Sequence, residues 1–251
     1  MRKLFASIGL VVAATGLSST AFAGFTNVGL VPAREHSQER ILETLYGGDF
    51  YRTGADFFNG TITVRRVDDT MTTTPAMSMA RGTIGDTTDE TWAGAKFTAR
   101  AVAKFSENTQ NLAIDGGNGL HHLFSALGSG YNVSGSATFD ANNIASARFI
   151  RSGDSGTHSS RASENSDGRD HMITYEVLGL SGVNDKVWVM FWEDLNKTPG
   201  MTNKRTFADY NDLVVETRAT AVPLPAGVWA ALALGGAAFS FKKRIRKIMG
   251  A

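Results

Sequence analysis

The heptapeptide Lys186–Trp192, with the sequence KVWVMFW, restricts the fold of this chain more than any other stretch. Two apolar sets alternate along it, namely Trp188, Met190 and Trp192 with Val187, Val189 and Phe191. Because successive side chains of a β-strand point to opposite faces, a strand formed here is apolar on both faces. We therefore expect it to be central in its sheet or covered on both sides.

Other short runs with strand-like composition are separated by turn residues. These runs are 61–65, 96–105, 110–114, 122–126, 134–139, 144–150, 171–177 and 210–217. The run 96–105 alternates apolar and polar residues and predicts a half-buried strand, with 110–114 as its hairpin partner. A helix is predicted over Gln38–Tyr46, with Ser37 as its N-cap and Gly47 just past its end. The pattern predicts an all-β fold, an antiparallel β-sandwich with one short N-terminal helix, and leaves jelly-roll connectivity open.

Two polar segments interrupt the strand pattern. Residues 67–91 are rich in Thr, Asp, Met and Gly, and residues 151–169 are rich in Ser, Asp and Gly. We predict that both are long loops. The chain has no cysteine, so disulfides and thiolate metal sites are excluded. The folded domain must depend on its apolar core, with bound metal ions as the remaining source of cross-links.

The N-terminal 23 residues predict a secretory signal peptide. Arg2 and Lys3 precede an apolar segment, and the small residues Ala21 and Ala23 are typical of a signal-peptidase site, with cleavage after Ala23. We therefore expect signal peptidase to be a partner of the precursor and the protein to be exported.

The C-terminal segment 222–251 has three parts. It begins with the motif Val222, Pro223, Leu224, Pro225 and Ala226. An uncharged apolar segment over 226–241 is predicted to form a transmembrane helix. A basic tail, 242–251, follows and carries Lys242, Lys243, Arg244, Arg246 and Lys247. Basic residues after a membrane span favour a cytoplasmic location for this tail.

This order of motif, apolar helix and basic cluster resembles the C-terminal sorting signal of PEP-CTERM proteins, in its VPLPA-CTERM form. The resemblance implies processing by exosortase, transient residence in the inner membrane of a Gram-negative-type bacterium, and a final location at the cell surface or in the extracellular matrix of a biofilm. Exopolysaccharide is then a possible partner. The alternative is a permanent membrane anchor. At 1.5 Å per residue, the 226–241 helix would be roughly 24 Å long against a bilayer core of about 30 Å, which favours a temporary one.

Residues 24–221 remain as one extracellular domain, which has the length expected for a single core. All 24 acidic residues lie in this part against 18 basic residues, so its net charge is −6 although the whole chain carries +1. Nucleic-acid binding needs a basic face. We therefore expect no nucleic-acid partner, and a domain compatible with cations or neutral glycans.

Acidic and amide residues gather at the predicted strand ends in the last third of the chain. The candidate metal ligands are Asp170, Glu193, Asp194, Asp209, Asn211 and Asp212. Calcium prefers about six to eight oxygen ligands from such groups, so a calcium ion is the possible cofactor. The alternative is that these residues end their strands through Asx-turns and satisfy loop amides.

The functional hypothesis is a non-enzymatic structural or adhesive protein of the cell surface or matrix. The first alternative is a carbohydrate-binding module for exopolysaccharide, in which Trp92, Tyr131, Tyr175 or Tyr210 would stack on sugar rings. The second is a secreted glycan hydrolase. That enzyme would need a pair of carboxylates, such as Glu193 with Asp209 or Asp170. No catalytic residue and no organic cofactor is predicted.

Overall fold

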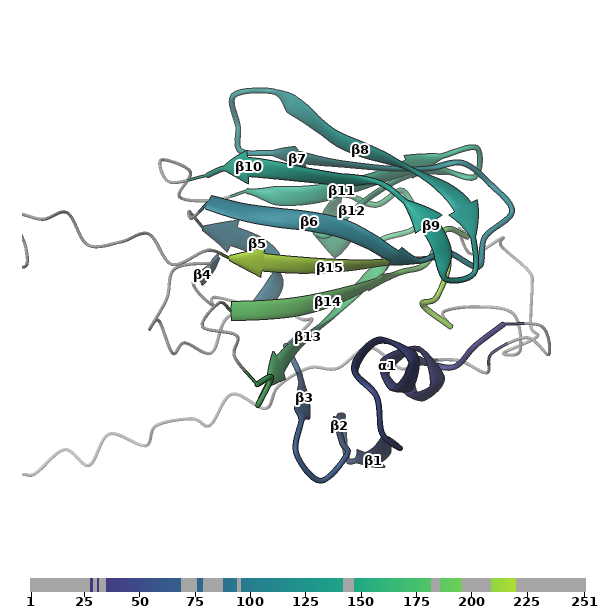
Figure 1. Ribbon diagram of the computed structural model, residues 1–251. Helices are drawn as coiled ribbons and strands as arrows, with labels where there is room; N and C mark the ends of the chain where they lie inside the picture. The colour runs from purple at the N-terminus through teal and green to yellow at the C-terminus, as the bar shows by residue number, and fades with distance from the viewer. Residues whose placement is uncertain are drawn as a thin grey trace, which may run out of the picture.

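The computed structural model describes residues 28, 31, 35–68, 76–78, 88–93, 96–141, 147–181, 186–195 and 209–219. The predicted signal peptide, sorting motif, transmembrane helix and basic cluster lie outside these residues. Within the described part of the chain, no helix has the length and apolarity needed to span a bilayer. The described residues form an all-β sandwich with one short α-helix (Figure 1).

Helix α1 spans Gln38–Tyr46, and a 3-10 turn η1 spans Ala162–Glu164. The strands are β1 (Tyr51–Thr53), β2 (Asp56–Phe58), β3 (Thr63–Arg66), β4 (Ala76–Ser78), β5 (Thr88–Ala93), β6 (Lys96–Ala103), β7 (Gln110–Asp115), β8 (Leu120–Ser129), β9 (Asn132–Ser134), β10 (Ser136–Asp140), β11 (Arg148–Gly153), β12 (Gly156–Ser159), β13 (Met172–Leu178), β14 (Lys186–Trp192) and β15 (Leu213–Ala219).

The predicted helix and both of its ends are confirmed. Local interactions at each end determine where the helix begins and ends. The Ser37 side chain accepts a hydrogen bond from the backbone N–H of Arg40, as an N-cap should. Gly47 has a φ of 76° and donates its N–H to the Glu43 carbonyl. Glycine adopts this left-handed geometry without the steric penalty of a side chain, so the helix ends there.

Two antiparallel sheets form the sandwich. The eight-stranded sheet has the order β1-β2-β3-β13-β14-β15-β6-β10, and the five-stranded sheet has the order β12-β11-β7-β8-β9. Strands β4 and β5 form a separate parallel pair. This strand order differs from the two four-stranded sheets of a jelly roll. Figure 1 shows α1 with β1–β3 on one side of the β13–β14–β15 region and the five-stranded sheet on the other.

Strand β14 is buried on both faces, as its sequence predicts. Trp188, Met190 and Trp192 belong to a core between the two sheets, called here the inter-sheet core. The three alternating apolar residues, Val187, Val189 and Phe191, belong to a second core with residues of α1, β2 and β3, called here the helix-side core. Strands β13 and β15 flank β14, so it is also central in its sheet.

The predicted hairpin between 96–105 and 110–114 is wrong. Strand β6 pairs with β15 and β10, whereas β7 pairs with β8 and β11 in the other sheet. Both edges of β6 are thus filled by strands from elsewhere in the chain. The residues between β6 and β7 cross from one sheet to the other.

The two predicted loops contain strands. Strand β4 and most of β5 lie within 67–91, and β12 and η1 lie within 151–169. Strand β12 was not predicted because its buried side chains, such as His158, are polar and produce no apolar alternation. In β5 the buried Trp92 anchors the strand, and its indole N–H donates to the Asp89 carbonyl at 2.7 Å.

Replacing Phe191 by Ala removes a fully buried ring from the helix-side core. We expect this change to lower the free energy of unfolding by about 3–5 kcal/mol, because a cavity remains that the two covering layers cannot fill. Urea denaturation followed by tryptophan fluorescence measures it. The control is Leu120→Ala on β8, where the side chain is 62% exposed and the loss should stay near 0.5 kcal/mol. Equal losses in the two variants would contradict the two-sided burial of β14.

Candidate metal centre

Sheet topology brings the predicted acidic residues to one edge. Strand β14 pairs antiparallel with both β13 and β15, so Trp192 lies opposite Met172 and Leu213. The end of β14 therefore meets the beginnings of its two neighbours. Glu193 follows β14 directly, and Asp212 directly precedes β15.

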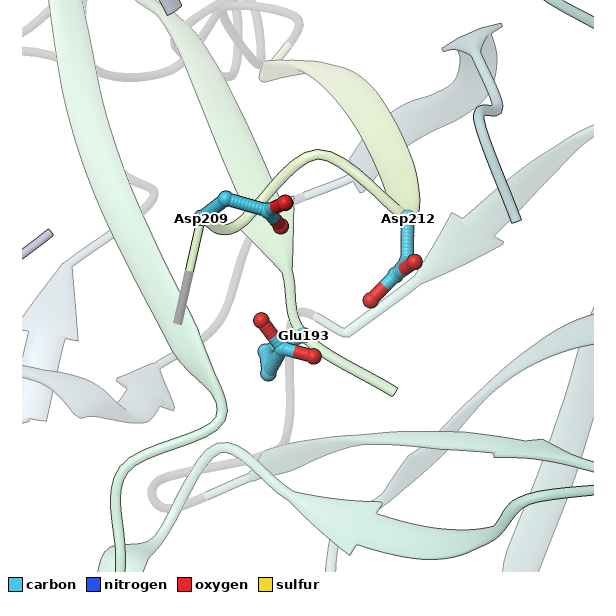
Figure 2. Close-up of side chains that lie close together, drawn as sticks. All are labelled: Glu193, Asp209 and Asp212. Atoms are coloured by element: carbon cyan, nitrogen blue, oxygen red, sulfur yellow. The ribbon is translucent and has the colours of Figure 1, made fainter. Parts of the chain in front are cut away.

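Three of the six candidate ligands converge. Figure 2 shows the carboxyl groups of Glu193, Asp209 and Asp212 pointing toward one another. One ligand oxygen from each lies within 4.8 Å of the other two. Backbone amides orient two of the carboxylates: the Leu195 N–H donates to Glu193 Oε1 at 3.1 Å, and the Asp194 N–H donates to Asp212 Oδ2 at 2.7 Å. We call these three residues the acidic cluster.

The loop before β15 holds its acids through an unusual backbone conformation. Tyr210 has a φ of 54°, and among the described residues it is the only non-glycine with positive φ. A bulky residue rarely adopts this left-handed geometry. Its ring is buried in the helix-side core, and its hydroxyl donates to the Asp170 carbonyl at 2.9 Å. Packing of this ring therefore offsets the energetic cost of the backbone conformation. That conformation in turn sets the positions of Asp209 and Asp212, which lie before and after Tyr210 in the sequence.

Burial and mutual repulsion raise the pKa of every member of the acidic cluster. Burial, with the charge of Asp209, raises the pKa of Glu193 to about 7. Burial, with the charges of Asp212 and Glu35, raises the pKa of Asp209 to about 8. Burial, with the charges of Glu193 and Asp194, raises the pKa of Asp212 to about 9. At neutral pH the cluster must hold protons or a cation.

The donor set suits a hard cation. The acidic cluster offers carboxylate oxygens alone, without histidine nitrogen or thiolate sulfur, and such sites favour calcium or magnesium over zinc. Three carboxylates supply up to six oxygens when bidentate, which is the lower end of the number that calcium prefers. The residues present therefore fit a calcium ion.

Two more polar residues adjoin members of the acidic cluster, Asn211 in the sequence and Glu35 in space. The Asn211 side chain donates its Nδ2 to the His36 carbonyl at 3.2 Å, while its buried Oδ1 has no hydrogen-bond partner in the described part of the chain. Glu35 lies near enough to Asp209 to raise its pKa by charge and by a hydrogen bond. Sequence reasoning named Asn211 but missed Glu35, because Glu35 lies at the other end of the domain and only the fold brings it here.

Asp170 and Asp194 lie outside the acidic cluster. Asp170 accepts the Met172 N–H at 3.0 Å, as in the Asx-turn that was the alternative for these residues. Asp194 Oδ2 accepts from Gln110 Nε2 at 2.7 Å and lies 3.3 Å from Nη2 of the buried Arg151. The Asp194 carboxylate is therefore neutralised inside the protein.

A buried polar network adjoins the acidic cluster and joins the two sheets. Arg151 on β11 contacts Nδ1 of His158 at 3.0 Å. The rings of His158 and His171 stack with centroids 3.8 Å apart and an interplanar angle of 4°. His171 lies 3.1 Å from Asp167 through Nε2 and 3.2 Å from the Glu193 carbonyl through Nδ1. These residues are isolated and polar in the sequence, so no spacing revealed the network.

Three of the four aromatic residues considered for sugar stacking belong to the cores. Trp92, Tyr175 and Tyr210 are buried. Tyr131 is partly exposed, and its hydroxyl lies 2.8 Å from Nδ1 of His36. Of the four, only Tyr131 can present a ring to a ligand.

No family model matches the sequence, and no curated protein matches it. Among solved structures, similar chains include a Chromobacterium violaceum lectin in complex with alpha-methyl-fucoside, with 21% identity over 53% of this chain and 92% of that chain. A Ralstonia solanacearum high-affinity mannose-binding lectin has 18% identity over 53% and 92%. The C-terminal domain of a Burkholderia cenocepacia lectin has 18% identity over 55% and 97%. The TM-score is 0.32 in each case. The chemistry of the site therefore has to follow from its own residues.

The stability of the calcium-free protein should fall as the pH rises. An acid whose pKa is higher in the folded protein binds its proton more tightly there, so folding is opposed once the unfolded chain ionises. The window runs from the ordinary carboxyl range near 4 to the raised values of about 7, 8 and 9 in the acidic cluster. Melting temperatures in a calcium-free buffer series from pH 5 to 9 test this. A stability that rises across this window would contradict it.

Calcium should reverse that loss, with a larger effect at pH 8 than at pH 5, because it binds the deprotonated carboxylates. At about 100 times the Kd, a rise in Tm of roughly 5–10 °C is expected at pH 8. Asp212→Asn keeps an acceptor for the Asp194 N–H but removes one charge, so it should raise the calcium-free Tm and abolish most of the calcium response. The exposed Asp49 provides the matched control, Asp49→Asn, which should respond like the wild type.

Proposed function

We propose that this chain is an exported, non-enzymatic surface protein whose sandwich is locked by a calcium ion at Glu193, Asp209 and Asp212. The observation that carries the proposal is the convergence of three buried or half-buried carboxylates, with one ligand oxygen from each within 4.8 Å of the other two. A divalent cation would replace their repulsion by attraction and join the end of β14 to the loop before β15. In a chain without cysteine, this cross-link would do the work of a disulfide.

The electrostatics of the acidic cluster favour a cation binder over a glycan hydrolase. An acid–base pair works because its two environments drive the pKa values apart, one carboxyl staying ionised while the other keeps a proton. Here burial raises the pKa of all three acids, to about 7, 8 and 9. A shared excess of negative charge is what a bound cation relieves.

Export and sorting complete the proposal. The signal peptide would direct the chain across the inner membrane, and exosortase would recognise the segment Val222–Ala226 before the apolar helix. The mature protein would then remain at the cell surface or in the extracellular matrix. Extracellular calcium sites commonly work at Kd values of about 0.1–1 mM, so a moderate affinity would suffice. The role in the matrix would be structural or adhesive.

Carbohydrate binding is the second candidate function. The observation that favours it is the position of Tyr131, which lines a pocket beside α1. An aromatic ring at the wall of a pocket with polar neighbours is a common arrangement for binding a sugar. This function is compatible with the calcium centre, because the ion would stabilise the domain while the pocket binds the ligand.

Intact-mass analysis of the mature protein from its native host tests the sorting proposal. We expect an N-terminus at Gly24 and a C-terminus near Pro223–Ala226, with or without an added group. A mature chain that retains Lys242–Ala251 would support the permanent anchor and contradict exosortase processing. Native mass spectrometry of the same sample should show one calcium ion per chain, removable by EDTA.

A further inference from the structure

A pocket of about 470 Å³ lies between helix α1 and the strands β6, β9 and β10, in a part of the molecule that the acidic cluster does not use. Figure 1 shows α1 beside the region where β6 and β9 meet. The volume lies within the range of about 300–1,000 Å³ typical of small-ligand sites. Its lining combines a cation, an aromatic ring and hydroxyl groups, namely Arg100, Tyr131, Thr44, Ser134 and Ser136.

A buried carboxylate holds the cation of this pocket in place. Arg100 Nη2 donates to Glu216 Oε1 at 3.1 Å, and Arg218 Nε donates to the same oxygen at 2.8 Å. The other oxygen of Glu216 accepts from the Tyr46 hydroxyl at 2.9 Å. Burial alone would raise the pKa of Glu216, but these partners lower it below its ordinary value, so the carboxylate is ionised. Glu216 therefore holds the Arg100 guanidinium in a fixed position at the pocket.

Most hydrogen-bond donors of Arg100 are available to a ligand. Its side chain is 57% exposed, and Glu216 is its only side-chain partner in the described part of the chain. A guanidinium carries five N–H donors in a planar fork that matches a carboxylate in a bidentate pair. The pocket thus presents an anion-binding group whose orientation is already fixed by Glu216.

The aromatic wall of the pocket is also held in place. The Tyr131 hydroxyl lies 2.8 Å from Nδ1 of His36, and its ring packs edge-on against Phe105 with centroids 5.7 Å apart. A fixed ring loses little conformational entropy when a ligand packs on it. An apolar ring face beside a cation and several hydroxyls matches a sugar that has one apolar face, several hydroxyls and one negative charge.

We propose that this pocket binds an acidic sugar, a hexuronate residue of a polysaccharide, with the sugar carboxylate on the Arg100 guanidinium and the sugar ring against Tyr131. The proposal deepens the carbohydrate-binding candidate and rests on it. A neutral sugar would offer the exposed N–H donors of Arg100 no anionic acceptor, so the guanidinium favours the uronate.

The test measures binding of hexagalacturonate and of neutral mannohexaose to the purified full chain by calorimetry, at physiological salt. The wild type should bind the uronate and bind the neutral sugar at least tenfold more weakly. Arg100→Gln should weaken uronate binding by about tenfold or more, the size expected for a lost charge-assisted hydrogen bond. Arg100→Lys keeps a cation for Glu216 but lacks the planar fork, so it should bind the uronate several-fold more weakly.

Arg65 provides a matched control. It lies on strand β3, and its side chain is 55% exposed. It forms an ion pair with one carboxylate, that of Glu176, as Arg100 does with that of Glu216. Arg65 does not line the pocket. Arg65→Gln should therefore leave uronate affinity within twofold of the wild type. Circular dichroism of each variant reports folding, and the lysine variant decides the case if Arg100→Gln fails to fold.

Three results would overturn the proposal: no uronate binding by the wild type, equal binding of mannohexaose, or equal affinities for Arg100→Gln and Arg65→Gln. The calcium response of each variant is measured in the same samples. A normal calcium response without uronate binding would reject the pocket and leave the metal centre standing. Uronate binding without a calcium response would reject the metal centre and support the pocket.

Discussion

The burial of β14 on both faces is the constraint on which the rest of the structure depends. Its two apolar sets require one layer from the five-stranded sheet and another from α1 with β2 and β3. That requirement places β14 between β13 and β15, and antiparallel pairing then brings Glu193 and Asp212 to one edge. The position of the acidic cluster is thus a consequence of core packing. A strand with one polar face would not have demanded this arrangement.

Features with local causes could be predicted from the sequence. The N-cap Ser37 and the terminal Gly47 bound helix α1, and the alternation along 186–192 identifies the central strand. The partner of 110–114 could not be predicted, because which strands fill the edges of a sheet depends on residues far apart in the sequence. Strand β12 could not be predicted for another reason. Its buried His158 contacts Arg151, so a polar side chain occupies an inward position where the sequence pattern would require an apolar one.

The candidate site, like the fold, could be predicted from the sequence only where local residues determine it. The sequence places Glu193 and Asp194 at a strand end, but it does not show which way each points. Adjacent residues of an extended chain face opposite sides. Glu193 accordingly joins Asp209 and Asp212, whereas Asp194 turns to Arg151. Glu35 was not predicted at all, because it is far from Asp209 in the sequence and only the fold brings the two acids together.

The way each buried carboxylate is balanced separates structural residues from candidate ligands. Asp194 is matched by Arg151, and Glu216 is matched by Arg100 and Arg218, so the fold itself supplies their counter-charges. The acidic cluster brings three carboxylates together, and the pocket beside Tyr131 exposes the guanidinium of Arg100. Buried carboxylates that repel one another are costly unless protons or a cation offset their charge. An exposed guanidinium carries no such cost, but its N–H donors are available to an anionic ligand. A cation would therefore complete the acidic cluster, and an anionic sugar would complete the pocket.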